Sequence, residues 1–381
     1  MASALNTTSR GILYEICQWG VGTDIGTWAS AIAGSWRISN DIYNAWRSIW
    51  RITNQVVPYY KHTGVGAYAD MDMLIVGLNA LSEEEERFHF GMWAIQKSPL
   101  TIGAPMDTTL TPATSLEILK NTEVIAINQD SLGKKARLVR RYTTEQYDVW
   151  LGELSGSRLV LGLANWYNGS QSVTVNLPAD LGIASASARD VWAAESVGTL
   201  SDSYTTTLAG HELRLLVLSD VVNATSGIQE SSQYYTAATD ATLSGNAVVV
   251  TCASGQCLPS GNKVGNIGQG QSAAAVTFSD VSASSAGTKL LGVDFINYDV
   301  ALDTAWELGD NTRNMTIAVN QSNGTRFAFP ISGGDWYDSG RLYVYVDGFT
   351  AGEENEVVFT SYGDAVTWAP DLVGFEIYEV N

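Results

Sequence analysis

Polar and aromatic side chains follow three short β-like runs near the start of the chain. The runs are ILYEIC, GSWRIS and AYADMDML, and the side chains at or just after their C-terminal ends are Gln18, Trp19, Arg37, Asp41, Asp70 and Asp72. In parallel βα folds, strand C-terminal ends meet at one rim, where functional residues gather. Carboxylates can break glycosidic bonds by acid/base and nucleophilic chemistry, while Arg binds hydroxyls and aromatic rings stack on sugars. The pattern therefore predicts a sugar site. The structural alternative is helix capping, which suits Asp41 because a helical run follows it.

The elements around these residues alternate between β-like and helical patterns through residue 130. A fourth β-like run, SPLTIG, follows the helical patterns of residues 40–60 and 82–96. Ser82 and Glu85 have the spacing of a capping box, and we interpret the run EEEE as a solvated helix N-terminus. Four strand–helix units fit into this length, whereas a closed eight-unit barrel needs about 250 residues. Residues 1–130 are thus predicted to form half of a (β/α)8 barrel.

The rest of the chain is predicted to be all-β. Residues 131–220 contain successive strand patterns separated by Gly, Asn and Ser turns, and so do residues 226–381. The polar stretch VVNATSGIQESS between them is typical of a linker. The predicted fold class is therefore multidomain: a half-barrel followed by two antiparallel β-sandwich domains.

Composition excludes several classes of function. The chain has 381 residues and a formal net charge of -19, which disfavours nucleic acid and anionic membranes as partners. Three His and three Cys are too scattered for a zinc site, and we find no phosphate-binding glycine loop. No apolar run is long enough to span a bilayer, and the first residues lack a signal-peptide pattern. Six sequons, however, predict a secreted glycoprotein: Asn6, Asn168, Asn223, Asn314, Asn320 and Asn323.

Several motifs resemble glycoside hydrolase family 27, which contains α-galactosidases, α-N-acetylgalactosaminidases and related retaining enzymes. They are CQWG, SWRISNDI, ADMDMLIVG, EEERFHFGMWAIQKSPLTIG and NTEVIAINQDSLGKKARLVRR, in that order along the chain. The resemblance extends to about residue 220 and includes the β-sandwich that follows the barrel in this family.

The resemblance implies a role for each rim residue. Asp41 matches the family's general acid/base, and Arg37 matches the Arg that binds a sugar hydroxyl beside the reaction centre. Asp72 and Met73 match residues that line the galactose pocket, and Asp70 supports them.

The neighbouring CQWG motif does not decide which sugar the site binds. Trp19 follows the family cysteine, Cys17, and is expected to line the substrate site. Gln18 stands where many members have a Glu that contacts the sugar 2-position. Galactosides, N-acetylgalactosaminides and β-L-arabinopyranosides therefore all remain candidate substrates.

The family's nucleophile has no counterpart in this sequence. In the family it is an Asp in a YDNC-like motif at the end of the fourth barrel strand, and the chain lacks such a motif. The resemblance therefore implies an N-terminally truncated, inactive chain. Cys17 would lose its family disulfide partner and remain a free thiol, or else be a simple buried apolar residue.

The last domain resembles carbohydrate-binding module family 35 through KVGNIG, SGGDWYDSG, WAPDLVGFEI and a cysteine pair, Cys252 and Cys257, which we expect to form a disulfide. Trp336 and Tyr337 are candidates for stacking on sugar, and the alternative is packing inside the sandwich. Such modules often hold structural calcium. Here YYTAAT lacks the usual early Glu, and only Asp371 remains, so no metal site is predicted.

Two hypotheses of function follow. The first is a retaining hydrolase that releases terminal α-D-galactose from oligosaccharides and polysaccharides and needs no cofactor. The second is a non-catalytic glycan-binding protein that acts through its C-terminal module. The sequence leaves the oligomeric state open.

Overall fold

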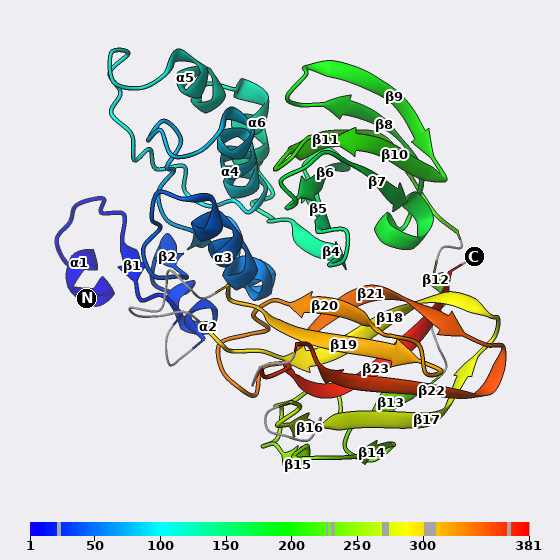
Figure 1. Cartoon of the computed structure of the whole chain (residues 1–381). Coiled ribbons are helices and arrows are strands. Elements are labelled where there is room, and N and C mark those ends of the chain that lie inside the picture. The colour runs from blue at the N-terminus through cyan, green and yellow to red at the C-terminus, as the bar shows by residue number, and fades with distance from the viewer. Residues whose placement is uncertain are drawn as a thin grey trace.

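The structure is a computed structural model that describes residues 1–20, 24–225, 228–229, 233–268, 274–300, 310–363 and 367–380. The predicted linker of residues 221–232 lies partly outside the described residues. Figure 1 shows a helical N-terminal segment beside one set of β-sheets, with a second set below both. Within the described part of the chain, no helix combines the length and apolar character needed to cross a membrane.

The N-terminal segment is built on a small parallel sheet. Its strands are β1 (Glu15–Cys17), β2 (Ser35–Arg37) and β3 (Tyr68–Asp70), in the order β1-β2-β3. Its helices are α1 (Ala2–Asn6), α2 (Ile25–Ala29), α3 (Trp46–Val56), α4 (Glu83–Ile95), α5 (Ala113–Leu119) and α6 (Thr122–Asn128), and a 3-10 turn (Val57–Lys61) follows α3. Ile16, Trp36 and Ala69 are paired across the sheet and buried in the same core as α2 and α3.

The expected fourth strand is wrong as a full strand. Residues 98–103 make one parallel bridge, between Ile102 and Leu74. The backbone between β3 and this bridge is interrupted at Asp72, whose φ of 79° lies in the left-handed region. The chain changes direction there, and the fourth run pairs with the backbone only beyond it, at Leu74.

Helix α4 begins as predicted, but its acidic run is only partly solvated. The Ser82 and Glu85 side chains form the expected capping box. Glu85 also contacts His211 Nδ1 at 2.7 Å. Glu86 is buried and accepts hydrogen bonds from Gly77 N (2.7 Å) and Ser115 Oγ (2.6 Å). The last two glutamates of the run therefore join α4 to other elements, which corrects the solvated interpretation.

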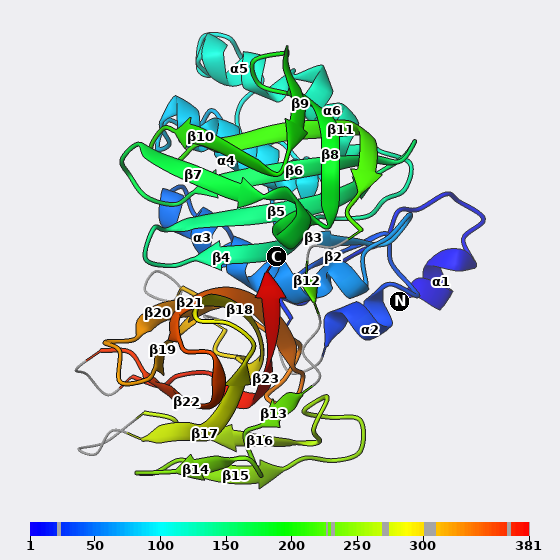
Figure 2. The same cartoon turned by 90° about the vertical axis from the view of Figure 1, so that its right-hand side faces the viewer.

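The middle segment forms two antiparallel sheets. Its strands are β4 (Arg137–Tyr142), β5 (Tyr147–Leu154), β6 (Arg158–Asn165), β7 (Gln171–Asn176), β8 (Ile183–Asp190), β9 (Glu195–Ser201), β10 (Ser203–Leu208) and β11 (Leu213–Asn223). One sheet has the order β4-β5-β6-β11-β8-β9, and β7 pairs with β10. Figure 2 shows α4 behind the larger sheet, and Trp150, Leu213 and Leu215 share one core with the helices.

The C-terminal segment forms two further sheets. Its strands are β12 (Ile228–Gln229), β13 (Tyr234–Thr236), β14 (Ala241–Leu243), β15 (Val248–Thr251), β16 (Asn262–Gly265), β17 (Ala275–Ala283), β18 (Gly287–Ile296), β19 (Arg313–Val319), β20 (Thr325–Phe329), β21 (Gly340–Phe349), β22 (Gly352–Ser361) and β23 (Asp371–Val380). One sheet runs β15-β16-β23-β18-β21, with β12 and β13 also on β23, and the other runs β14-β17-β22-β19-β20. Their inner faces share a core that includes Phe278, Phe359 and Phe375.

One buried arginine joins the three segments. Arg141, on β4, forms a bidentate pair with Asp148 of β5, with N–O distances of 2.8 and 2.7 Å. The same guanidinium donates to Asn54 Oδ1 of α3 (2.7 Å) and to the Ala328 carbonyl of β20 (3.2 Å). The buried Arg141–Asp148 pair is thus part of the packing between segments rather than of one sheet alone.

Candidate active site

The parallel register brings the predicted rim residues together. Cys17, Arg37 and Asp70 are neighbours across β1, β2 and β3, so the segments after them leave the sheet at the same edge. Trp19 N donates to the Arg37 carbonyl at 3.1 Å, with Trp19 at a φ of 71°. This contact holds the segment after β1 against the end of β2.

Arg37 connects the two most important carboxylates. Its Nη2 atom lies 3.1 Å from Asp41 Oδ1 and 2.7 Å from Asp72 Oδ2. The Asp41 side chain is 70% exposed, whereas the Asp72 side chain is 7% exposed. Asp41 is therefore accessible to a substrate, while Asp72 is held inside the rim.

Asp72 is held by three donors. Besides Arg37, Ile42 N donates to its Oδ2 and Met73 N to its Oδ1, each at 2.7 Å. Asp72 N in turn donates to Asp70 Oδ1 at 2.8 Å. The Asp70 carboxylate thus stabilises the turn at Asp72 by accepting a hydrogen bond from its backbone.

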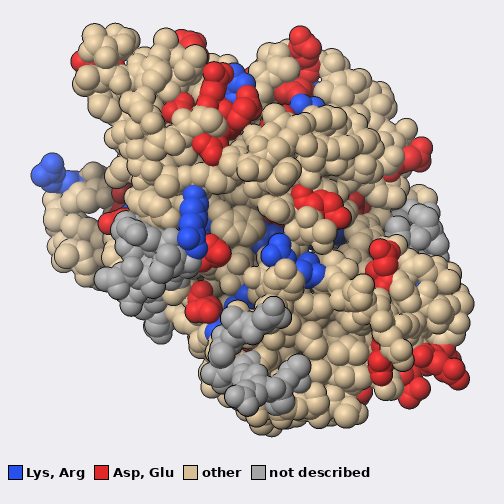
Figure 3. Space-filling view, in the orientation of Figure 1, with Lys and Arg blue, Asp and Glu red and all other residues tan. Residues whose placement is uncertain are grey.

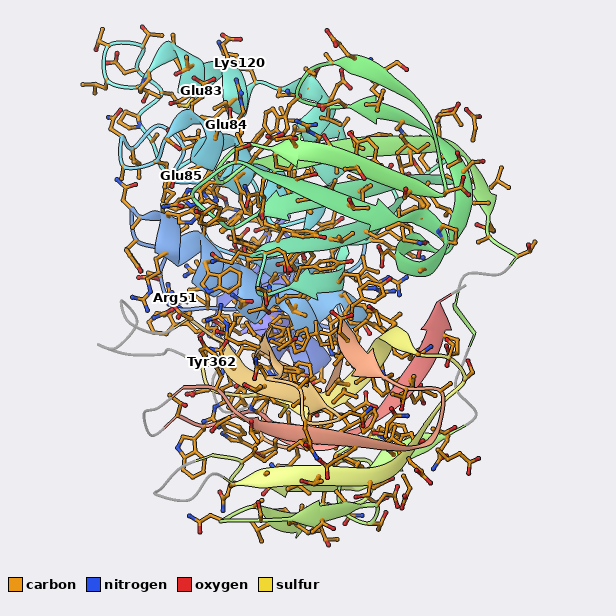
Figure 4. All side chains as sticks on the ribbon, turned by 45° about the vertical axis from the view of Figure 1, so that its right-hand side comes forward. Arg51, Glu83, Glu84, Glu85, Lys120 and Tyr362 are labelled. Atoms are coloured by element: carbon orange, nitrogen blue, oxygen red, sulfur yellow. A yellow bond between two sulfur atoms is a disulfide. The ribbon has the colours of Figure 1, made fainter. Side chains whose placement is uncertain are left out.

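Two residues of the site went unnoticed in the sequence. Arg51, on α3, donates to the Asn40 side-chain oxygen and, at 3.0 Å, to the Asp41 carbonyl. Burial lowers the pKa of its guanidinium from the usual value. Figure 4 labels Arg51 on the blue helical segment beside the C-terminal sheets. The one sequence signal available for Arg51 was an Arg on the apolar side of a helical pattern.

The second residue is Trp93, whose Nε1 donates to the Asp72 carbonyl at 2.7 Å.

The C-terminal segment supports the same rim. Asn311 Nδ2 donates to the Arg51 carbonyl and to Gln55 Oε1, both at 3.0 Å. Gln55 Nε2 continues to the Trp19 carbonyl at 3.1 Å, and Tyr298 OH donates to the Gly20 carbonyl at 2.9 Å. Residues between β18 and β19 therefore hold the backbone that carries Gln18 and Trp19.

The remaining substrate candidates lie at the surface of the rim. Gln18 Oε1 accepts from Gly20 N at 3.0 Å, within its own turn. The Met73 side chain is 42% exposed. Among the described residues, Trp19 Nε1 and Arg37 Nε are buried donors without a hydrogen-bond acceptor. Such donors are suited to bind ligand hydroxyl groups.

The candidates in the C-terminal segment lie apart from this rim. The structure has the disulfide expected between Cys252 and Cys257, while Cys17 is free and exposed, so the buried alternative for it is wrong. Trp336 is half-buried against that disulfide, with the Arg313 guanidinium 4.6 Å from its ring centroid. Such contacts favour a packing role for Trp336.

The Tyr337 side chain is exposed, whereas the Asp371 side chain is largely buried. Tyr337 is 40% exposed and lines a cavity of about 210 Å³ between the C-terminal and N-terminal segments. Asp371 is paired with Lys263 at 2.7 Å, and burial raises its pKa. The part of the chain that the structure describes contains no cluster of three or more potential metal ligands.

We expect Asp70 to make stability depend on pH. Burial raises its pKa from 3.8 to about 6, so the folded protein binds this proton more tightly than the unfolded chain. The associated stabilisation is complete below about pH 4 and is lost as the pH rises through 6. Asp70→Asn keeps an oxygen for Asp72 N and should therefore stabilise the protein at pH 7 by about 1–3 kcal/mol, with little effect at pH 4. Melting temperatures of both proteins at both pH values test this, and an equal difference at the two values would contradict it.

Two family models match most of the N-terminal and middle segments. A family model described as "Alpha galactosidase A" matches residues 1–130, and one described as "Alpha galactosidase C-terminal beta sandwich domain" matches residues 144–218. α-Galactosidase D from Emericella nidulans is 34% identical over 485 aligned positions, which cover 100% of this chain and 72% of that protein. The chain belongs to glycoside hydrolase family 27, the α-galactosidase family. A protein described as a probable α-galactosidase D from Aspergillus fumigatus is 35% identical, with the same coverage.

Solved structures of family 27 enzymes match more than half of the chain. α-Galactosidase I from Mortierella vinacea is 32% identical, with a TM-score of 0.54, and the match covers 59% of this chain and 62% of that enzyme. The α-galactosidase of Saccharomyces cerevisiae is 27% identical, with a TM-score of 0.53 and coverage of 57% and 66%. This chain therefore spans less than two thirds of the solved enzymes that it matches. Enzymes of the family act without a cofactor.

Proposed function

We propose that this family 27 chain carries the acid/base half of a retaining α-galactosidase site. The observation that carries the proposal is the Arg37 guanidinium, which holds exposed Asp41 and buried Asp72 at one strand-end rim. Asp41 would protonate the leaving oxygen and then deprotonate the attacking water. Asp72 and the free donors of Trp19 and Arg37 would bind sugar hydroxyls.

Retention of configuration also needs a nucleophilic carboxylate about 5–5.5 Å from the acid/base. Asp72 is a poor nucleophile because three donors already hold its oxygens. Asp70 is a poor one because it is largely buried and accepts from Asp72 N. We therefore propose that the described residues supply no nucleophile, and that residues 1–381 alone do not hydrolyse galactosides.

The test compares the 381-residue chain with any longer product of the same gene, using an aryl α-galactoside. We expect turnover by the longer product and none by the shorter chain. Turnover by the shorter chain that Asp41→Ala abolishes would show that its own carboxylates suffice. Binding of α-galactosides with turnover by neither protein would favour the alternative, a non-catalytic glycan-binding protein.

The candidate substrates differ in the substituent at the 2-position of the sugar and in its exocyclic group. One solved relative, 25% identical with a TM-score of 0.52, is a β-L-arabinopyranosidase from Geobacillus stearothermophilus. Since the curated relatives are α-galactosidases, we propose galactosides as the preferred substrates, from oligosaccharides to polysaccharides. Aryl α-galactoside, α-N-acetylgalactosaminide and β-L-arabinopyranoside assayed side by side decide among these specificities.

We also propose that the protein is secreted and glycosylated, as its fungal relatives and six sequons indicate. Asn6, Asn168, Asn223 and Asn323 are exposed. Asn320 is a poor acceptor because its amide donates to the Gly348 carbonyl (3.0 Å) and to Asn355 Oδ1 (2.7 Å).

A further inference from the structure

A cavity of about 530 Å³ lies where the three segments meet, apart from the Asp41 rim. None of Arg37, Asp41 and Asp72 is among the residues that line it. Its walls come from α3, from the β4–β5 hairpin and the end of β6, and from the segment around β19 and β20. Figure 3 shows several basic side chains at mid-height on this face, between the upper segments and the C-terminal sheets.

Aromatic side chains form one side of this junction cavity. Trp46 and Trp50 lie one turn apart on α3, and Trp166 contacts both, with ring centroids 5.6 and 4.6 Å away. Tyr142 and Tyr147 stack on one another at 4.2 Å on the β4–β5 hairpin. All three tryptophans remain partly exposed, so ring surface is available to a ligand.

Arginines on the cavity walls differ in their partners. Arg141 is neutralised by Asp148, and Arg47 is paired with Asp310 at 3.0 Å. Arg326 has no carboxylate within ion-pair distance among the described residues, and its guanidinium lies 5.0 Å from the Tyr362 ring centroid. Among the described residues that line the cavity, one positive charge therefore has no paired carboxylate.

This local charge has the opposite sign to that of the surrounding protein. The chain carries a net charge of -19, and residues 226–381 contain 5 Lys and Arg but 18 Asp and Glu. At physiological ionic strength, charges farther away than about 8 Å are largely screened. Arg326 therefore affects a ligand in the cavity more than the distant acidic residues do.

We propose that the junction cavity binds a short oligosaccharide that carries a carboxylate, namely a uronic acid residue. The volume lies within the range of about 300–1,000 Å³ typical of small-molecule sites. Trp46, Trp50 and Trp166 offer ring surface to the sugar faces, and Gln146 and Thr312 offer hydrogen bonds to hydroxyls. Arg326 would bind the carboxylate, for which the planar guanidinium is well suited.

Calorimetric titration with trigalacturonate and with its fully methyl-esterified form tests the proposal. The two probes share the same sugar chain, and the methyl ester removes the negative charge of each carboxylate. The protein is first freed of N-glycans, because Asn314 on the cavity wall belongs to a sequon. We expect the acid to bind and the ester to bind at least tenfold more weakly, since one charge-assisted contact is lost.

Variants then locate the binding. Arg326→Gln should weaken trigalacturonate binding at least tenfold, and Arg326→Lys should retain part of it. Arg189→Gln is the matched control, because Arg189 pairs with Glu123 on the surface and does not line the cavity. Asp41→Asn should also leave binding unchanged. Melting temperatures verify that each variant folds.

Three results would overturn the proposal. They are absence of trigalacturonate binding at millimolar concentration, equal binding of the acid and the ester, and undiminished binding by folded Arg326→Gln.

Discussion

Replacing Asp41 with Asn in a longer, active product of the same gene is expected to lower hydrolysis of melibiose by about 10²- to 10⁴-fold, the usual contribution of a general acid/base. Melibiose has a poor leaving group that needs a proton, whereas a nitrophenyl galactoside has a good one. Formation of the glycosyl-enzyme from the aryl substrate should therefore fall much less. Single-turnover kinetics with both substrates measure the difference.

The control for this prediction is Glu117→Gln, which removes an exposed carboxylate paired with Lys120 on α5. Its activity should be unchanged on both substrates. Because the Asp41 side chain is 70% exposed, Asp41→Asn should also fold with nearly unchanged stability. Equal losses on the two substrates would contradict the acid/base role and would favour a helix-capping or structural role for Asp41.

Replacing Asp148 with Ala is expected to destabilise the protein by about 3–5 kcal/mol, because it leaves the Arg141 guanidinium buried without its anion. The two side chains are 2% and 1% exposed, so water cannot replace the lost partner without rearrangement. Trp166 Nε1 also loses its acceptor, Asp148 Oδ2, at 2.8 Å. Urea unfolding, followed by tryptophan fluorescence, measures the loss as a lower midpoint.

Glu153→Gln provides the matched comparison on the same strand. Glu153 pairs with Lys134 at 2.7 Å, but both side chains are more than half exposed. Such surface pairs contribute about 0–1 kcal/mol, so this variant should unfold close to the wild type. If Asp148→Ala were no more destabilising than Glu153→Gln, the Arg141 contacts would not hold the three segments together.

Local sequence patterns were sufficient to predict the elements whose interacting residues lie close together in the chain. The Ser82–Glu85 capping box, the α4 helix and the Cys252–Cys257 disulfide all involve partners a few positions apart, and the structure has each of them. Family membership was equally accessible, because several motifs occur in order along one chain. The absence of a full fourth parallel strand could not be foreseen, because the turn at Asp72 and the single bridge beyond it do not follow from strand propensity.

The sequence by itself determined which residues stand at the strand ends, because chain order and side-chain alternation place Arg37, Asp41, Asp70 and Asp72 there. Tertiary structure alone decided how they are held. Arg51 reaches the Asp41 carbonyl from the next helix, and Asn311 reaches Arg51 from 260 positions away. Contacts at such separations leave no periodic signal in the sequence, since each depends on how whole elements pack. The same packing of separate segments created the junction cavity around Arg326, which no single stretch of residues could reveal.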